Sequence, residues 1–568
     1  MAYPIVQFRF RRRGKHTYVY LLQKGRRDGH VVNTAEIYLG TQDEVIRRLT
    51  TPAEGGLQGL EFLPYPFATS AAVLAADEAL GFSRTVQEVT GSRAAAAALL
   101  AFIAGRAHEP VSKNGMEEWA SRSLFHFLPR TPSLTCRRYL DHMDRLTPEV
   151  VEAIALRLGE RLVAQGHRPS LVFFDPTNFS TEQEPDRDDL DRQLPRAGYP
   201  KDGNPQAKLV GLAIATTERS LPVFHRTYPG NVNDARLFRE MVGEMTEKLV
   251  KMGAAAEELC FVFDKGNNSK PGFAALGAAK AHFVSSLKRN QVKDLLTRPA
   301  SAYRKLYQTE KGTEIRGFRA PREVMGVKGV AVVAYNEAGR KRQERDFERA
   351  RARFLEGSRE IARKLSQAHR GRRSTRESVA LRVSDLVPKK WRAVFRYKVG
   401  VTLDQAFGKR QPRFTVRAWV DREAEERRRE GFGRTVVFTD RVDWDDEKIV
   451  RTYFARSGQE EDFHVLKDVL LMPVMPIFHR RDARIKVHAF LCVVGLLFYR
   501  WIQRKVEKAT KQRVSIERLA NVLRQIQVVA LVKTEGKEVS VAKVVLQKLS
   551  EEQEKVAKAL DLSRYVPK

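Results

Sequence analysis

Cysteine is scarce in this chain. Its 568 residues include three cysteines, Cys136, Cys260 and Cys492, and no two of them form a CxxC pair. Cysteines so few and so far apart exclude a disulfide-based scaffold and a zinc site built on cysteine. We therefore expect an intracellular protein of a reducing compartment.

Long apolar runs are also missing. The longest, residues 489–498, has about half of the 18 or more residues that a membrane-spanning helix needs. The chain opens with MAYPIVQFRF, which leads directly into a charged strand pattern and contains no signal-peptide core. The sequence predicts neither a transmembrane helix nor a secretion signal.

Acidic residues are too few to balance the basic ones. Lys and Arg total 101 against 69 Asp and Glu, which gives a net charge of +32. Such a surplus favours a polyanionic partner, with nucleic acid first and an anionic membrane surface second. A hydrophobic fraction of 42% and a charged fraction of 30% indicate a folded globular protein. At about 150 residues per domain, the length predicts three to four domains.

Hydrophobic patterning divides the chain into six segments around an α/β core. The eight Lys and Arg of residues 1–30 either follow DNA phosphates or form a solvated strand face, and residues 341–373 carry 12 basic against five acidic residues. Which segment reads DNA is open, with the helices of 65–166 favoured over the N-terminal strands. We predict a small basic β unit (1–62), a helical candidate DNA-binding region (63–168), the first part of the core (169–289), a basic α+β insertion (290–432), the last part of the core (433–482) and a C-terminal helical region (483–568).

Two aspartates each follow a short apolar run. Asp175 comes after LVFF and Asp264 after LCFVF. A buried strand that ends in an isolated aspartate puts a carboxylate at the edge of a sheet, where a site can open. Two such carboxylates suit a pair of divalent cations, which activate water or a 3′-hydroxyl for phosphoryl transfer. The alternative is that each aspartate begins an ordinary turn.

A denser acidic cluster lies close behind the first of these strands. It has interspersed arginines and no apolar frame that would hold a rigid geometry. We interpret it as a solvated loop, made of Glu182, Glu184, Asp186, Asp188, Asp189 and Asp191.

The most specific pattern is Tyr453, Arg456, Glu460 and Lys467. On a continuous helix of 3.6 residues per turn, these offsets fall within an arc of roughly 60°. One carboxylate and two cations on one face suit a metal ion and a scissile phosphate. The alternative is a surface helix with an Arg456–Glu460 ion pair.

Two features complicate this helix. Ser457 and Gly458 lie inside it, and a glycine within a helix costs about 1 kcal/mol relative to alanine, so the helix is expected to start late or bend there. Glu461 could be the ligand instead of Glu460, but on a regular helix it would point about 100° away.

These residues resemble a known family. The segment YFARSGQEEDFHVLK (453–467) fits every spacing of the Y-x2-R-x3-E-x6-K signature of bacterial insertion-sequence transposases of the DDE class, in the subgroup with a long insertion before the glutamate. The resemblance spans most of the chain and is strongest from about 170 to 500. It also rests on FFDPTNF (173–179), YPGNVNDARLF (228–238), FVFDKG (261–266), MPIFHRRDARIKVHAFL (475–491) and the N-terminal stretch 15–40.

The resemblance implies a ribonuclease-H-like core and cut-and-paste transposition that depends on two Mg²⁺ ions, with Mn²⁺ as a substitute. It assigns metal binding and catalysis to Asp175, Asp264 and Glu460, and DNA phosphate contact to Tyr453, Arg456 and Lys467. The implied partners are double-stranded DNA with terminal inverted repeats, target DNA and a second copy of the chain in a homodimeric synaptic complex. The implied location is the bacterial cytoplasm, at the nucleoid.

Two further interpretations stay open. A transposase-derived protein that binds DNA without catalysis would carry the same charge. Related enzymes stack a flipped base on an aromatic of the insertion, for which Trp391 and Trp419 are present, although an aromatic in an alternating strand is usually part of a core.

Overall fold

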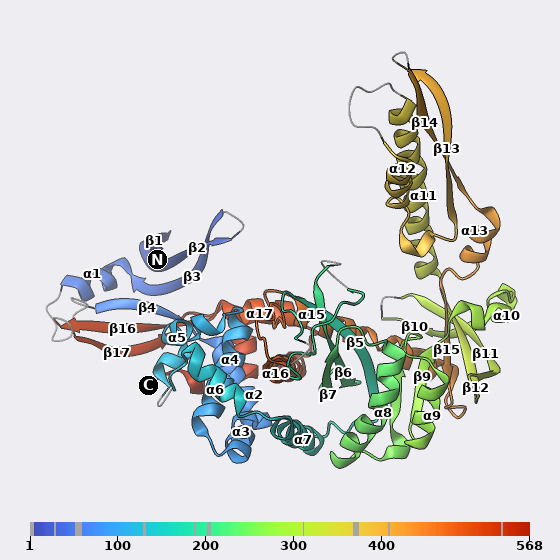
Figure 1. The fold of residues 1–568 in the computed structure, drawn as a ribbon. Coiled ribbons are helices and arrows are strands. Elements are labelled where there is room, and N and C mark those ends of the chain that lie inside the picture. Colours follow the sequence, from blue (N-terminus) through green and yellow to red (C-terminus); the bar gives the residue numbers. More distant parts are fainter. Residues whose placement is uncertain are drawn as a thin grey trace. The chain divides into compact units, whose positions relative to one another are not determined.

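The computed structural model forms two compact units (Figure 1). Unit 1 comprises Met1–Phe261, Ala274–Ala281 and Ala455–Lys568, and unit 2 comprises Val262–Phe273 and His282–Phe454. The structure describes residues 5–27, 30–50, 60–128, 132–186, 189–200, 206–310, 312–366, 374–406, 409–535 and 538–567.

An antiparallel sheet forms the N-terminal part of unit 1, as predicted. Val19 and Leu22 are buried, whereas Phe8 and Phe10 are more than half exposed. Arg11 pairs with Glu36 at 3.1 Å. The other basic residues described on the first strand are exposed, which fits either role predicted for them. The elements are β1 (Ile5–Arg13), β2 (His16–Arg27), β3 (His30–Thr41) and the helix α1 (Gln42–Thr50).

The region 63–168 is helical, as predicted, apart from its first residues. Ser92 caps α4 by accepting a hydrogen bond from the Ala95 amide, and Thr147 caps α7 in the same way. The last two helices both pack on α16; α6 also packs on α4, and α7 on α2, α3 and α8. Helix packing therefore accounts for their apolar faces. The helices are α2 (Ala68–Leu80), α3 (Phe82–Thr90), α4 (Arg93–His108), α5 (Met116–Ser121), α6 (Cys136–Asp144) and α7 (Pro148–Ala164).

The C-terminal region is not purely helical, so that part of the prediction is wrong. Strands β16 (Gln527–Glu535) and β17 (Glu538–Leu546) form a hairpin, and β16 also pairs with β4 (Leu60–Pro66). The frequent valines of these segments explain the strands, because β-branched residues favour them. Their flanking helices are α16 (Asp482–Thr510), α17 (Ile516–Arg524) and α18 (Glu551–Ala559).

Helix α16 is the central helix of unit 1. Among the described residues it is long and apolar enough to cross a membrane, although the uninterrupted apolar runs predicted no such helix. Its most apolar stretch has a mean hydropathy of 1.6, and 89% of that stretch is buried inside the protein. Burial of this extent is what the core helix of a globular protein shows.

The α/β core predicted from the apolar strands is confirmed. In unit 1 the strand order is β8-β5-β6-β7, with β5 (Leu171–Thr181), β6 (Lys208–Thr217) and β7 (Pro222–Pro229) antiparallel. Helix α8 (Asp234–Lys251) follows, capped by Asn233. Strand β8 (Cys260–Phe263) begins in unit 1, where the Cys260 amide donates to the Ser170 carbonyl, and ends in unit 2.

A buried histidine makes the stability of this sheet depend on pH. His225 of β7 stacks on Phe490 of α16 with ring centroids 5.2 Å apart. Burial, and then the charge of Lys248, lowers its pKa to about 4. The folded protein therefore holds His225 neutral, whereas the unfolded chain protonates it near pH 6.5.

We expect His225 to make unit 1 less stable in acid. Its contribution is fully present above pH 6.5 and is lost at about 1.4 kcal/mol per pH unit as the pH falls from 6.5 toward 4. Urea unfolding of the wild type and of His225→Phe between pH 7.5 and 4.5 measures this, and the variant should show the shallower decline. Equal slopes for the two proteins would contradict the prediction.

Unit 2 contains the other strands of the core. Their order is β10-β11-β12-β15-β9, and β9 (His282–Ser286) pairs with β15 (Arg434–Thr439). Strands β10 (Arg304–Gln308), β11 (Glu314–Val324) and β12 (Val327–Asn336) therefore extend the sheet, although the sequence places them in the insertion that begins at residue 290. Because β12 pairs with β15, the part that leaves the sheet starts only at residue 337.

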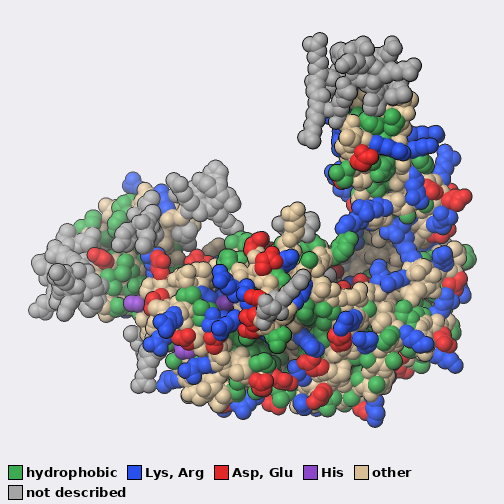
Figure 2. All heavy atoms as spheres, in the orientation of Figure 1, with side chains coloured by type: hydrophobic (Ala, Val, Ile, Leu, Met, Phe, Trp, Pro, Cys, Tyr) green, Lys and Arg blue, Asp and Glu red, His purple; other side chains and the backbone are tan. Residues whose placement is uncertain are grey.

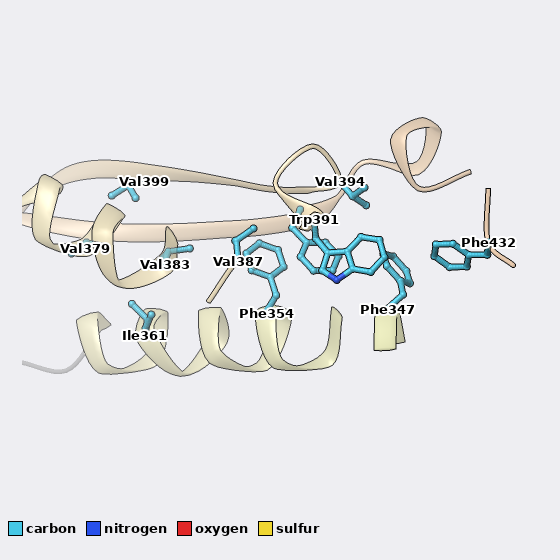
Figure 3. Close-up of a cluster of buried hydrophobic side chains, with 11 residues drawn as sticks. Phe347, Phe354, Ile361, Val379, Val383, Val387, Trp391, Val394, Val399 and Phe432 are labelled. Carbon is cyan, nitrogen blue, oxygen red and sulfur yellow. The ribbon is translucent and has the colours of Figure 1, made fainter. Parts of the chain in front are cut away.

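The insertion module consists of α11 (Glu337–Ser366), α12 (Arg376–Ser384), α13 (Arg422–Arg429) and the ribbon β13 (Phe395–Ala406) and β14 (Lys409–Val420). Its core contains Phe347, Phe354 and Trp391 (Figure 3). Phe354 stacks on Phe395. Trp391 thus belongs to the core and is 3% exposed, whereas Trp419 is 41% exposed. Lys and Arg side chains are frequent on the face of this module in Figure 2. The end of the basic stretch 341–373, residues 367–373 with Ala368, lies outside the described residues.

Candidate active site

Asp175 lies in the middle of β5 and not at a strand end, so the predicted position is wrong. The strand continues to Thr181, and Asp175 pairs in register with Ile214 of β6. Buried residues on both sides, Phe174 and Phe179, keep β5 in the sheet beyond the aspartate. The Asp175 side chain is half-buried.

A tyrosine fixes the strand next to Asp175. The hydroxyl of Tyr228 donates to the Thr177 carbonyl at 3.0 Å. Burial raises the pKa of Tyr228, and the carboxylates of Asp234 and Asp175 raise it further. Tyr228 therefore stays protonated and donates close to the first carboxylate.

Gly211 makes room for this tyrosine. It faces Tyr228 across the β6–β7 pair, and a Cβ at this position would lie 2.2 Å from Tyr228 Cε2. Gly211→Ala is expected to destabilise the protein by about 1–3 kcal/mol, because the ring must move. Chemical unfolding measures the change.

Gly243 of α8 is the matched control for this substitution. An added Cβ there meets nothing within 4 Å, and alanine is the better helix former by about 1 kcal/mol. Gly243→Ala should therefore be neutral or stabilising. If Gly211→Ala were as stable as Gly243→Ala, the close approach of the tyrosine ring would not constrain the strand.

Asp264 comes directly after β8, as predicted, and two hydroxyl groups hold it in unit 2. Ser286 Oγ donates to its Oδ1 at 3.0 Å, and the Tyr453 hydroxyl donates to the same oxygen at 3.2 Å. The loop that follows is tied to the next strand, because Asn268 Nδ2 donates to the Ser286 carbonyl at 2.8 Å. The carboxylate is therefore oriented by its own unit.

The four signature residues do not lie on one continuous helix, so that prediction is wrong. Helix α14 (Asp446–Phe454) carries Tyr453 and ends one residue later, and α15 (Ser457–Lys467) begins after Arg456. The break occurs where Ser457 and Gly458 were expected to delay the helix. A Cβ at Gly458 would lie 2.8 Å from Ser220 Oγ.

Helix α15 is fastened to the strand that bears Asp175. The side-chain amide of Gln459 donates to the Phe173 carbonyl of β5. Farther along, Lys467 Nζ lies 6.0 Å from the ring centroid of Phe179. Glu460 is exposed, and unit 1 thus places it on the helix that packs on β5.

The acidic residues next to Glu460, Glu461 and Asp462, interact with α16. Arg500 of α16 donates to Asp462 Oδ1 at 2.7 Å and to Glu461 Oε2 at 3.2 Å. Its guanidinium also reaches the Gly458 carbonyl at 3.4 Å. Glu461 is therefore engaged on the α16 side of the helix, whereas Glu460 is not part of this network.

The acidic loop, which was predicted to be solvated, also caps the start of α16. Asp191 Oδ1 accepts from the Ala483 amide at 2.8 Å at the start of α16, and Asp482 accepts from the amides of Gln193 and Leu194. Negative charge at a helix N-terminus is stabilising. Asp188 lies outside the described residues.

The three predicted ligands are all carboxylates. Asp175 and Glu460 belong to unit 1 and Asp264 to unit 2. Within the described ranges, no three His, Cys, Asp or Glu side chains form a ready-made cluster. Hard oxygen donors of this kind fit Mg²⁺ by their chemistry.

Sequence reasoning missed Ser286, Asn268 and Arg500. The sequence around the serine at the end of β9 does not indicate that it contacts Asp264, because only the folded chain brings the two residues together. Arg500 did carry a signal, since it is a lone cation in an apolar helical run, and such a cation is buried only when it is paired.

A comparison with curated proteins finds no match. The family model of the transposase DDE domain matches residues 166–496, which is more than half of the chain and includes both aspartates, the insertion module and the signature. The mixed α/β core is compatible with that domain. The chain belongs to the DDE transposase family, whose members cleave DNA and transfer its strands.

Proposed function

We propose that this protein is a transposase that binds the terminal inverted repeats of its insertion sequence, cuts the DNA there and joins the 3′ ends to target DNA. The observation that carries the proposal is the packing of α15 against β5. Gln459 bonds the strand two residues before Asp175, and the adjacent Glu460 is exposed. A carboxylate-bearing helix fixed on a carboxylate-bearing strand supplies acid ligands on rigid elements.

In this proposal Asp175, Asp264 and Glu460 are the metal ligands. When bound, two Mg²⁺ ions polarise the scissile phosphate and activate the attacking water or 3′-hydroxyl, and Mn²⁺ should substitute. Ser286 and Tyr453 orient the Asp264 carboxylate through their hydrogen bonds.

The cationic residues of the signature have the DNA-facing roles. Arg456 immediately precedes α15 and Lys467 ends it, so the proposal puts both on phosphate oxygens, where charge-assisted bonds are strong. Tyr453 is buried and donates a hydrogen bond to Asp264. In this proposal its main role is to orient Asp264, and contact of its ring edge with the DNA backbone is a lesser role.

The finer assignment is to the bacterial signature subgroup with the long insertion. It is supported by the fit of all four spacings at 453, 456, 460 and 467. The insertion module 337–432, between Asp264 and Glu460, supports it as well. We also propose a homodimeric synaptic complex at the bacterial nucleoid, with the helices of 63–168 reading the repeat ends.

Cleavage of a linear DNA that carries the repeats flanking this gene tests the proposal. We expect nicking at the repeat ends with Mg²⁺ and none with EDTA. Asp264→Asn should bind the DNA and not cut it, while Asp443→Asn, an exposed aspartate of the same unit that pairs with Arg441, should cut normally. Tight binding without cleavage under Mg²⁺ or Mn²⁺ would indicate a DNA-binding protein without catalysis. Cleavage that ignores the repeats would indicate a structure-selective nuclease.

A further inference from the structure

A cavity of about 510 Å³ opens in unit 1, and the residues that line it include none of the proposed metal ligands. Its walls come from the last turns of α16, the turn between β6 and β7, and the segment after α7. Trp501, Arg504, Lys505 and Lys508 line it from α16. These offsets of three, four and seven residues put all four side chains on one face of the helix.

The cavity carries a net positive charge. Arg219, Arg504, Lys505 and Lys508 line it with one acid, Glu507. Glu507 Oε1 accepts from the Val514 amide at 3.2 Å. In the described part of the chain, none of the four cations forms an ion pair with Asp or Glu, although many surface cations of this protein do.

Hydrogen bonds hold the two arginines of the cavity in place before any ligand arrives. Both Nε and Nη2 of Arg504 donate to the Arg219 carbonyl, the former at 2.8 Å. The Arg219 guanidinium is 3.2 Å from His167 Nδ1. Burial, and then the two arginines, lowers the pKa of His167, so at neutral pH the ring is uncharged and accepts this bond.

An aromatic face completes the cavity. Trp501 is half-buried, and Lys505 Nζ lies 5.7 Å from its ring centroid. Cations that surround an aromatic ring are the combination that nucleic-acid grooves use, since the cations follow the phosphates and the ring contacts sugar or base. Repulsion among fixed cations is relieved when an anion binds between them.

We propose that this cavity binds phosphodiester groups of DNA, as a docking site separate from the metal ligands. The choice of DNA over other anions rests on the proposed function, whose substrate is DNA. The same phosphate chemistry could come from a free nucleotide or pyrophosphate, and the experiment separates these sources. Arg504 also lies beside the Arg500 network that holds α15, so DNA bound here would lie against the support of the signature helix.

The test measures the salt dependence of duplex binding in EDTA, with full-length protein. Each phosphate contact contributes about 0.9 to the slope of log K against log salt concentration. Lys505→Gln/Lys508→Gln should therefore lower the slope by about 2. Lys251→Gln/Lys555→Gln removes the same charge from exposed lysines of unit 1 that pair with Glu247 and Glu551, and it should leave the slope unchanged.

Protection of lysines from acetylation identifies the ligand. Duplex DNA should protect Lys505 and Lys508 in the wild type and leave Lys555 reactive. Protection by pyrophosphate or a mononucleotide but not by duplex DNA would overturn the proposal in favour of a free phosphate ligand. Equal slopes for the two double variants would overturn it as well. Neither result bears on metal-dependent cleavage, which Asp264→Asn tests on its own.

Discussion

Glu460→Gln is expected to lower the rate of DNA cleavage by about 10³-fold, whereas Glu461→Gln should cleave within a few-fold of the wild type. The two residues are adjacent on α15 and both are exposed. A loss of 10³ corresponds to about 4 kcal/mol of transition-state stabilisation, which is what one charged metal ligand supplies. Single-turnover cleavage of repeat-end DNA at saturating Mg²⁺ gives the rates.

The contrast follows from the contacts of the two glutamates. Glu461 is bound by Arg500, at 3.2 Å from Nη1, and a bond of this kind at the surface contributes about 1 kcal/mol or less. Glu460 lies next to Gln459, which is fixed to β5. Because glutamine keeps the size of the side chain and removes its charge, both variants should fold and bind DNA equally.

The opposite result would revise the ligand assignment. Normal cleavage by Glu460→Gln together with loss in Glu461→Gln would make Glu461 the ligand and would require the Arg500 bond to open on metal binding. Loss in both variants with weakened DNA binding would point to a disturbed helix. A Mg²⁺ titration separates the cases, since a missing ligand raises the metal concentration that half-maximal cleavage requires.

The local elements of the core could be predicted from the sequence because their signals are local. The strands 208–216 and 221–228 and the helix that starts after Asn233 follow from apolar alternation, a turn and a capping residue. Asp264 was correctly expected directly after its strand for the same reason. The position of Asp175 was predicted wrongly. The apolar run stops at this aspartate, and that pattern resembles the end of a strand although the strand continues.

The features that sequence reasoning missed depend on contacts between distant segments. The hairpin at the C-terminus is completed by β4, more than 450 residues earlier in the chain. The break before α15 was expected from Ser457 and Gly458, although the spacing of the signature residues fits a continuous helix and did not indicate it. Gly458 was a warning, and its neighbour Ser220 comes from a turn that no spacing rule connects to it.

Arg500→Met is expected to destabilise unit 1 by about 3–5 kcal/mol, the usual cost of removing one partner from a buried ion pair. The Arg500 side chain is 4% exposed and that of Asp462 is 2% exposed, and their closest atoms are 2.6 Å apart. Methionine fills much of the space but leaves the Asp462 carboxylate without its cation. Urea unfolding of the full chain gives the free energies.

The loss should depend on pH and should be largely reversed by a second change. Burial raises the pKa of Asp462 to about 7, and Arg500 opposes that rise. Without Arg500 the folded pKa of Asp462 rises further above the unfolded value of 3.8. The stability of the variant is therefore retained below about pH 4 and is lost as the pH rises from there through the raised folded pKa. Arg500→Met/Asp462→Leu removes both charges and should recover most of the free energy of unfolding.

The double variant shows whether the Arg500–Asp462 pair only stabilises the protein or also positions α15. Arg500 also holds the Gly458 carbonyl at the start of α15, and an apolar pair cannot replace that bond. If the pair only stabilises, Arg500→Met/Asp462→Leu should cleave DNA at the wild-type Mg²⁺ requirement. We expect instead that it folds stably and needs more Mg²⁺ for half-maximal cleavage. The orientation of Glu460 depends on where α15 begins, and Arg500 is one of the groups that fix that point.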